Sequence, residues 1–240
     1  IYGTEKDKVN CSFYFKIGAC RHGFKCTRKH VKPTYSQTLL IFNIYQNPAL
    51  SNMASQYNEQ QLQEHFDLFF EDLFIELAKF GEIEELNVCD NVGDHLVGNV
   101  YVRFRYEEDA QKAMESLNDR FYAGRPVYCE LSPVTDFKES CCRQYDNDEC
   151  TRGGFCNFMH LKKASKQLKR ELFDSQKKYL KIKRREEEEA RAKAEKENPS
   201  SRRSGRERGA SRERGEERYS SRDRDFEGRE RDYSKRRRYD

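Results

Sequence analysis

The chain has 240 residues, of which 37% are charged and 35% hydrophobic, with a formal net charge of +4 and no tryptophan. Because charged, apolar-poor segments cannot offset the entropy lost on ordering, the folded part must be shorter than the chain. No apolar run reaches membrane-spanning length, so we expect no transmembrane segment and no membrane partner. Two cysteine clusters with metal-like spacing favour a reducing nuclear or cytosolic compartment over a disulfide framework. Because the chain begins at Ile1 and not at methionine, we expect further residues before it.

The first element is a cluster with the spacing C-x8-C-x5-C-x3-H, formed by Cys11, Cys20, Cys26 and His30. Three thiolates and one imidazole complete a tetrahedral zinc site. Such a site supplies most of the folding energy of a module that is too short to bury a core. We therefore predict a CCCH zinc finger over residues 1–33, with structural Zn²⁺ as its cofactor.

Residues 38–132 have the pattern of a β-α-β-β-α-β domain, so the fold class is α+β. A wide apolar stripe with helical spacing runs from Leu62 to Leu77, and Gly81 follows it as a stop signal. Strands are predicted at 38–44, 82–89, 97–104 and 126–131, and a shorter helix at 110–117. In this topology the strand order is 4-1-3-2. Because short linkers join both fingers to the neighbouring first and last strands, we expect the fingers to meet at one edge of this domain.

The strand at 97–104 is close to the RNP1 pattern of RNA-recognition motifs, whose two central strands stack bases on aromatic side chains. Two of the expected aromatic positions are occupied by Asn99 and Leu40, and only Tyr101 remains. Each missing aromatic ring removes roughly 1–3 kcal/mol of binding free energy from base stacking. The sequence thus favours a sheet that supports the fold over a sheet that binds RNA.

A second cluster follows with the spacing C-x7-C-x5-C-x3-H, formed by Cys142, Cys150, Cys156 and His160. It predicts a second finger over residues 137–162 and a second structural zinc site. Cys141 would restore the x8 spacing of the first finger. We favour Cys142 as the ligand, but the spacing alone leaves both cysteines open.

The remaining sequence predicts a helix over 164–197 and a disordered tail over 198–240. Leu168, Leu172, Tyr179 and Ile182 share one side of the helix, and this side is expected to dock on the body. The tail alternates arginine with glutamate, aspartate, serine and glycine, a composition that cannot form a core. It is similar to a degenerate Arg-Ser domain, and its basic run at 235–238 could aid nuclear import or contact RNA weakly.

Four long strings carry a family resemblance: Asn10 to His30 (NCSFYFKIGACRHGFKCTRKH), Val88 to Phe104 (VCDNVGDHLVGNVYVRF), Glu130 to Phe137 (ELSPVTDF) and Cys141 to His160 (CCRQYDNDECTRGGFCNFMH). With them the chain resembles the small subunits of the U2 snRNP auxiliary factor, which are nuclear pre-mRNA splicing proteins. The resemblance implies recognition of the AG dinucleotide at the 3′ splice site. It also implies a heterodimer with a large subunit that binds the adjacent pyrimidine tract, and contacts of the tail with Arg/Ser-rich splicing proteins.

The residue types of both fingers fit RNA binding, because unpaired bases are bound by stacking on aromatic rings and guanidinium planes and by hydrogen bonds to their edges. Aromatic side chains such as Tyr14 or Phe158 could instead pack around zinc, and the arginines could be a solvated surface. The candidate RNA-binding residues are Phe13, Arg21, Thr27, Arg28, Lys29, Arg143, Gln144, Arg152, Phe155 and Phe158.

The resemblance also implies a protein-binding variant of the RNA-recognition motif, in which a partner tryptophan enters a pocket closed by an Arg-x-Phe segment. Here the matching segment is Arg120, Phe121 and Tyr122, so two of the family's aromatic residues differ. Phe121 can still pack on prolines, but with less area. Glu71 and Asp72 on the first helix are candidate contacts for basic partner residues, or simply part of a solvated face.

Two other functions compete with this interpretation. A CCCH protein that acts in RNA decay or export shares the fingers, but the altered sheet and the Arg-x-aromatic segment favour a partnered splicing factor. A zinc enzyme needs an open coordination position, whereas each site here has four protein ligands. The deaminase signature and a phosphate-binding loop are both absent from the sequence. We therefore expect no catalysis and no small-molecule substrate.

Overall fold

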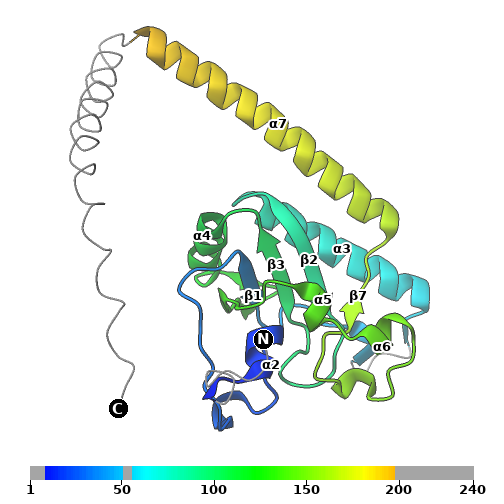
Figure 1. The fold of residues 1–240 in the computed structure, drawn as a ribbon. Helices are drawn as coiled ribbons and strands as arrows, with labels where there is room; N and C mark the ends of the chain where they lie inside the picture. Colours follow the sequence, from blue (N-terminus) through cyan, green and yellow to red (C-terminus); the bar gives the residue numbers. More distant parts are fainter. Residues whose placement is uncertain (1–8, 51–55, 198–240) are drawn as a thin grey trace, which may run out of the picture. The chain divides into compact units, whose positions relative to one another are not determined.

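The computed structural model describes residues 9–50 and 56–197 (Figure 1). The described residues up to Leu180 belong to one compact unit, and those from Lys181 onward to a second. The predicted disordered tail, including its basic run at 235–238, lies outside the described ranges. No helix within these ranges is both long and apolar enough to cross a membrane.

The helices and strands alternate along the chain as the sequence predicts for an α+β domain between two fingers. In chain order they are α2 (Ser12–Ile17), β1 (Thr38–Ile41), α3 (Glu59–Ala78), β2 (Ile83–Cys89), β3 (Val100–Phe104), α4 (Glu107–Leu117), β4 (Phe121–Tyr122), β5 (Arg125–Pro126), β6 (Cys129–Leu131), α5 (Phe137–Ser140), α6 (Arg143–Asp146), β7 (Leu161–Lys162) and α7 (Lys166–Glu197). Short 3-10 turns lie at Gly23–Lys25, Pro48–Leu50 and Gly153–Phe155.

The main sheet has the strand order β6-β1-β3-β2-β7, and all its neighbours are antiparallel. The neighbouring strands β6, β1, β3 and β2 confirm the predicted order 4-1-3-2. The fifth strand, β7, was not predicted. It directly follows the second finger and pairs with the edge of β2, where Val88 lies opposite Lys162.

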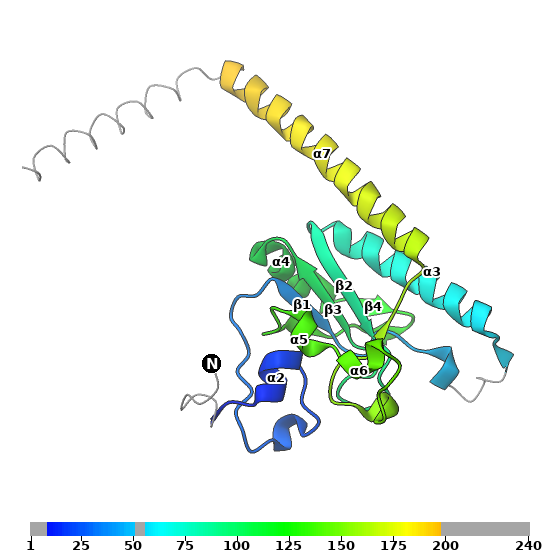
Figure 2. The same cartoon turned by 45° about the vertical axis from the view of Figure 1, so that its right-hand side comes forward.

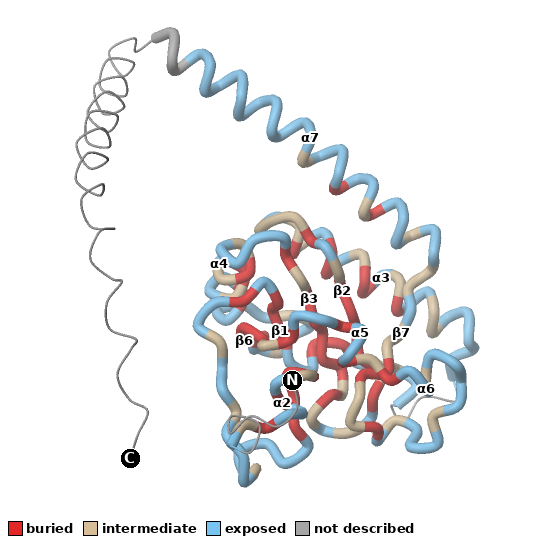
Figure 3. The backbone as a smooth tube through the Cα atoms, viewed as in Figure 1, coloured by how far each residue is buried: buried red, intermediate tan, exposed pale blue. Residues whose placement is uncertain are grey.

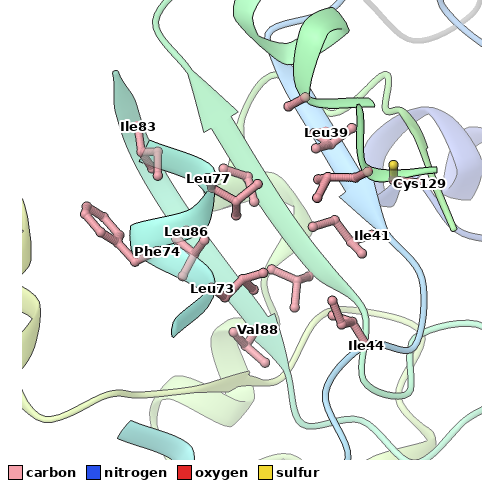
Figure 4. Close-up of a cluster of buried hydrophobic side chains, with 14 of the residues drawn as sticks. Leu39, Ile41, Ile44, Leu73, Phe74, Leu77, Ile83, Leu86, Val88 and Cys129 are labelled. Atoms are coloured by element: carbon pink, nitrogen blue, oxygen red, sulfur yellow. The ribbon is translucent and has the colours of Figure 1, made fainter. Parts of the chain in front are cut away.

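The core lies between the sheet and the helices α3 and α4 (Figure 4). Strand side chains alternate between the two faces: Leu39 and Ile41 join this core, whereas Leu40 belongs to a second cluster on the opposite face. Helix α3 contributes Leu73 and Leu77 to it. It begins with a reciprocal capping box between Asn58 and Gln61, which satisfies two donors at its first turn.

The predicted strand at 97–104 is three residues too long, because regular pairing starts only at Val100. Gly98 has a positive φ of 62°, and a Cβ atom there would lie 2.1 Å from the carbonyl oxygen of Tyr45. The side chain of the next residue, Asn99, accepts from the backbone N–H of Asn43 and donates to the carbonyl of His95. Asn99 therefore holds two loops together and does not present a face to a base.

The last predicted strand, 126–131, is also too long. Strand β6 begins at Cys129, while Arg125 and Pro126 form β5 and pair with β4 in a separate hairpin. The hairpin turn consists of Ala123 and Gly124, both with positive φ. The first strand likewise ends at Ile41, three residues before its predicted end.

The first part of α7 docks on the body, as predicted, through Leu172 and the partly buried Leu168. A contact that was not predicted is made by the buried side chain of Gln176. Its amide accepts from the backbone N–H of Ile83 at 3.1 Å and donates to the carbonyl of Ile83 at 2.9 Å. Tyr179 lies on the same side and lines a groove with Phe74 and Ile75 of α3, although it is 58% exposed. Ile182 is 55% exposed.

Candidate metal centres and nucleic-acid interface

Each cysteine and histidine cluster gathers four ligand atoms that lie within 4.8 Å of one another. The two clusters are also built alike. In each finger the backbone N–H of the first cysteine donates to the carbonyl of the residue before the histidine, at 2.9 Å from Cys11 to Lys29 and at 2.9 Å from Cys142 to Met159. The third cysteine of each cluster directly follows a 3-10 turn. The sequence repeat is therefore a structural repeat.

The histidines fit a metal because their Nε2 atoms are buried and have no hydrogen-bond partner in the described structure. A buried acceptor without a partner costs free energy, and a zinc ion would bind its lone pair. Each imidazole is fixed by a tyrosine: the ring of His30 stacks on Tyr14 at 4.5 Å, and that of His160 on Tyr145 at 4.0 Å. The predicted alternative that Tyr14 packs beside the zinc site is thus confirmed.

The ionisation of the clusters also fits zinc. Burial, assisted by the neighbouring thiol of Cys11, raises the pKa of the Cys20 thiol to about 11, so a bound cation would be needed to hold it as a thiolate. Burial lowers the pKa of His160, assisted by the charge of Arg152. The imidazole therefore stays neutral at physiological pH, which is the form that binds a metal.

The structure resolves which neighbouring cysteine belongs to the second cluster. Cys142 is the member, whereas Cys141 packs against the apolar cluster under the fingers. Burial raises the pKa of the Cys141 thiol to about 12, as expected for a thiol that serves only packing. The prediction of Cys142 is confirmed.

The second finger is anchored to the loop between β2 and β3 by the buried side chain of Asn91. Its amide donates to the carbonyls of Cys156 and Phe158 at 3.1 and 3.0 Å, and its oxygen accepts from the backbone N–H of His160 at 2.8 Å. Sequence analysis missed this residue. A single asparagine in a loop gives no sign that it holds a segment about 65 residues away.

The sheet face that binds RNA in RNA-recognition motifs is covered here (Figure 3). Tyr101 is completely buried. It lies in an apolar cluster with Ile17 of α2, Phe137 of α5 and Met159 of the second finger, and its ring contacts that of Phe137 edge-on at 6.2 Å. The predicted role of this sheet, to support the fold, is therefore confirmed.

The fingers meet on this covered face and not merely at its edge (Figures 1 and 2). The rings of Phe13 and Phe158 are 6.5 Å apart in an edge-to-face arrangement. In addition, the hydroxyl of Ser140 donates to the carbonyl of Lys16 at 2.5 Å. The expectation that the fingers form one surface is confirmed.

A pocket of about 360 Å³ lies at the junction of the fingers. It brings together four of the predicted RNA-binding residues, Arg143, Gln144, Arg152 and Phe158. Arg152 donates to the side-chain oxygen of Gln144 at 2.8 Å, which orients both groups. Lys16 and Lys138 also line the pocket and were missed, because single lysines outside a motif carry no local signature.

The other predicted RNA-binding residues lie outside this pocket. Arg21, Thr27, Arg28 and Lys29 are exposed on the first finger, and Phe155 is 70% exposed on the second. Phe13 is 40% exposed at the junction and contacts the pocket through Phe158. The pocket also contains one acid, Glu139, which pairs with Lys16 at 3.7 Å, and the first finger adds the exposed cations Arg21, Arg28 and Lys29.

The predicted partner segment lies against α3. The guanidinium of Arg120 forms an ion pair with Glu76 at 2.5 Å, and the ring of Tyr122 contacts Phe69 edge-on at 6.0 Å. Phe121 between them is 71% exposed. Sequence analysis missed Glu76, whose pKa is lowered by Lys79 and Arg120.

The two predicted acids lie on the same helix: Asp72 is exposed and Glu71 half-buried. Burial raises the pKa of Tyr122, and the charge of Asp72 adds to this shift. The hydroxyl of Tyr122 therefore lies within the electrostatic reach of this carboxylate. Of the two acids, Asp72 is the one that the structure places beside the segment from Arg120 to Tyr122.

Comparison with known proteins agrees with this arrangement. A model of the RNA recognition motif family matches residues 70–128, and a model of zinc fingers of the C-x8-C-x5-C-x3-H type matches residues 6–32. The chain is 63% identical over 187 residues to the splicing factor U2AF 23 kDa subunit of Schizosaccharomyces pombe. The aligned region covers 78% of this chain and 87% of that protein.

Two animal relatives are similarly close. Identity is 62% over 181 residues to the splicing factor U2af 38 kDa subunit of Drosophila melanogaster, covering 72% of this chain and 69% of that protein. Identity is 60% over 179 residues to the splicing factor U2AF 26 kDa subunit of Homo sapiens, covering 72% of this chain and 81% of that protein. With an RNA recognition motif between two CCCH clusters, the chain belongs to the family of U2AF small subunits, which are splicing factors and not enzymes.

Proposed function

We propose that the chain recognises the AG dinucleotide at the 3′ splice site through its paired fingers. It would do so as the small subunit of a heterodimer whose large subunit binds its RNA-recognition-motif domain. The observation that carries this proposal is the pocket at the finger junction, where Arg143, Arg152 and Phe158 converge. Tyr101, the one aromatic platform left on the sheet, is buried. An unpaired base can therefore find a guanidinium, an amide and an aromatic ring at the junction but not on the sheet.

The fluorescence anisotropy of two short labelled RNAs tests this role. Both RNAs carry a uridine-rich stretch, and one ends in AG and the other in AC. We expect zinc-loaded protein, with a large-subunit peptide present, to bind the AG probe about tenfold more tightly or better, because a lost base contact costs roughly 1–3 kcal/mol. Equal affinities would mean that the fingers supply only charge, and would favour a general RNA-binding role in decay or export.

The partner site is the second part of the proposal. Arg120, Phe121 and Tyr122 would close a pocket for an aromatic side chain of the large subunit, with the exposed ring of Phe121 packing on the partner's chain. Asp72 and Glu71 would attract basic residues that flank this anchor. The ion pair of Arg120 with Glu76 supports this assignment, because it fixes the segment against α3 before any partner binds.

A charge-reversal variant tests the partner site. The chain contains no tryptophan, so the emission of a tryptophan-containing large-subunit peptide reports binding without background. We expect Glu71→Lys with Asp72→Lys to weaken binding of the peptide about tenfold, as two attractions of up to ~1 kcal/mol each become repulsions. Glu186→Lys with Glu187→Lys on α7 is the matched control. Equal affinity of all three proteins would assign these acids to a solvated face.

The place of action belongs to the same proposal. A splicing factor acts on pre-mRNA, so we infer that the protein is localised in the nucleus. The basic run at 235–238 would support import, and the arginine-rich tail would contact other Arg/Ser-rich splicing proteins. Both segments lie outside the described residues, so these assignments rest on composition and on the family.

A further inference from the structure

A second, larger groove lies between β7 and the start of α7, beside α3 and β2. Its volume is about 810 Å³. The floor is apolar, formed by side chains such as Phe70, Leu86 and Phe173, and the amides of Gln63 and Asn87 lie beside it. None of these residues belongs to the fingers or to the partner surface around Arg120.

The rim of this groove is strongly cationic. It carries six cations and one acid: Lys162, Lys163, Lys166, Lys169, Arg170 and Lys177 against Asp174. In the described structure Lys166 and Arg170 make no ion pair. Lys169 lies over the ring of Phe173 at 6.0 Å. Lys162, Lys163 and Lys177 pair with Asp90, Asp146 and Asp174. The other three cations leave the rim with a net positive charge, which attracts a polyanion.

The groove is continuous with the second finger. Strand β7 begins at the residue after the ligand His160. Lys163 reaches back to Asp146, the last residue of α6, at 3.4 Å. Both side chains of this ion pair are largely exposed, so the pair contributes little and is easily exchanged for another anion. Helix α6 itself carries Arg143 and Gln144 of the junction pocket.

We propose that this groove, defined by Lys163, Lys166, Lys169 and Arg170, binds the sugar-phosphate backbone of the RNA strand that continues beyond the finger junction. This inference rests on the proposed RNA-binding function. It adds a binding site outside the fingers that prolongs the strand's path along the first three turns of α7.

The groove's cations on α7 lie in two groups: Lys166, Lys169 and Arg170 on the first two turns, and Lys177 two turns further on, beyond Asp174. The distance from Lys166 to Lys177 is roughly 16 Å at the rise of an α-helix. An RNA strand carries one charge per nucleotide and can therefore contact both groups along this length. The half-buried ring of Phe173 offers a base contact of the kind found in single-strand channels.

The test compares RNA lengths in the full-length, zinc-loaded chain. A short probe ends just past the AG on both sides, and two longer probes extend it by several nucleotides, one at the 5′ end and one at the 3′ end. The groove variant combines Lys166→Gln, Lys169→Gln and Arg170→Gln. The matched control combines Lys178→Gln, Lys183→Gln and Arg185→Gln, which removes the same charges from exposed positions of α7 outside the groove.

We expect one extended probe to bind more tightly than the short one, and only the groove variant to lose this gain. Three lost phosphate contacts lower the slope of log affinity against log salt by about 2 for a single strand. Between 50 and 200 mM salt, the unmodified chain would then lose roughly 15- to 20-fold more affinity for that probe than the groove variant does.

Three results would overturn the inference. The groove variant could keep the full gain from extension, or the control could lose it equally. Alternatively, the groove variant could lose affinity only for an acidic large-subunit peptide, which would make the groove a protein-binding site. A failure of the underlying function is distinguishable, because it would appear as equal binding of short AG and AC probes by the unmodified chain.

Discussion

Cys142→Ala is expected to reduce the zinc content of the purified chain from two ions to one, measured by atomic emission. Cys142 is one of four ligands of the second site, and its backbone N–H also donates to Met159. Structural zinc contributes about 10–16 kcal/mol of apparent binding free energy in small fingers at neutral pH. A site with three protein ligands should therefore lose its metal, and the residues around it should lose their protection from amide exchange.

The neighbouring cysteine provides a matched control for this substitution. Cys141→Ala removes a half-buried thiol that packs against the apolar cluster under the fingers, so both zinc ions should remain. The expected cost is about 1 kcal/mol of stability from lost packing. A loss of zinc from Cys141→Ala with retention in Cys142→Ala would reverse the ligand assignment.

Asn91→Ala is expected to destabilise the second finger strongly, although Asn91 is not a zinc ligand. It removes three hydrogen bonds to Cys156, Phe158 and His160 and leaves their buried backbone groups without partners. Because each orphaned group costs roughly 1–3 kcal/mol, the free energy of unfolding should fall by about 3 kcal/mol or more. Chemical denaturation of the zinc-loaded chain measures this change.

Asn87→Ala is the control for this second substitution. Asn87 is also buried and lies on β2, but its amide donates only to the side chain of Glu85. Its replacement should cost about 1 kcal/mol. If both variants lost the same stability, Asn91 would not anchor the second finger. If Asn91→Ala lowered stability without faster amide exchange in residues 150–160, the loss would have another origin.

The parts of the molecule that the sequence predicts well are those fixed by local spacing. The ligand set of the first finger spans only Cys11 to His30, so the order of its residues is enough to identify it. The second finger shows where spacing fails, because Cys141 and Cys142 both permit a plausible site. The choice depends on the bond from Cys142 to Met159, which repeats the bond from Cys11 to Lys29. A sequence pattern does not show this equivalence.

The parts that were missed depend on long-range contacts between short segments. Strand β7 has only two residues, Leu161 and Lys162, and it exists because the second finger places it beside β2. Sequence analysis considered only the apolar side of the start of α7 and gave its lysines no role. Only the position of β7 makes these lysines one wall of a groove. The starts of β3 and β6 were misplaced because Gly98 has a positive φ and because Pro126 pairs with β4 in a separate hairpin.

The position of β7 and the burial of Tyr101 also determine how the molecule can be divided experimentally. A fragment that ends after β6 would lose the strand that closes the edge of β2, and it would expose Leu40 and Tyr101 to water. An open strand edge beside newly exposed apolar side chains promotes self-association. The boundaries that are natural in the linear sequence are therefore poor places to cut the chain. Chelation of zinc from either finger should also loosen the sheet beneath it, so that metal supply and the integrity of the whole body are coupled.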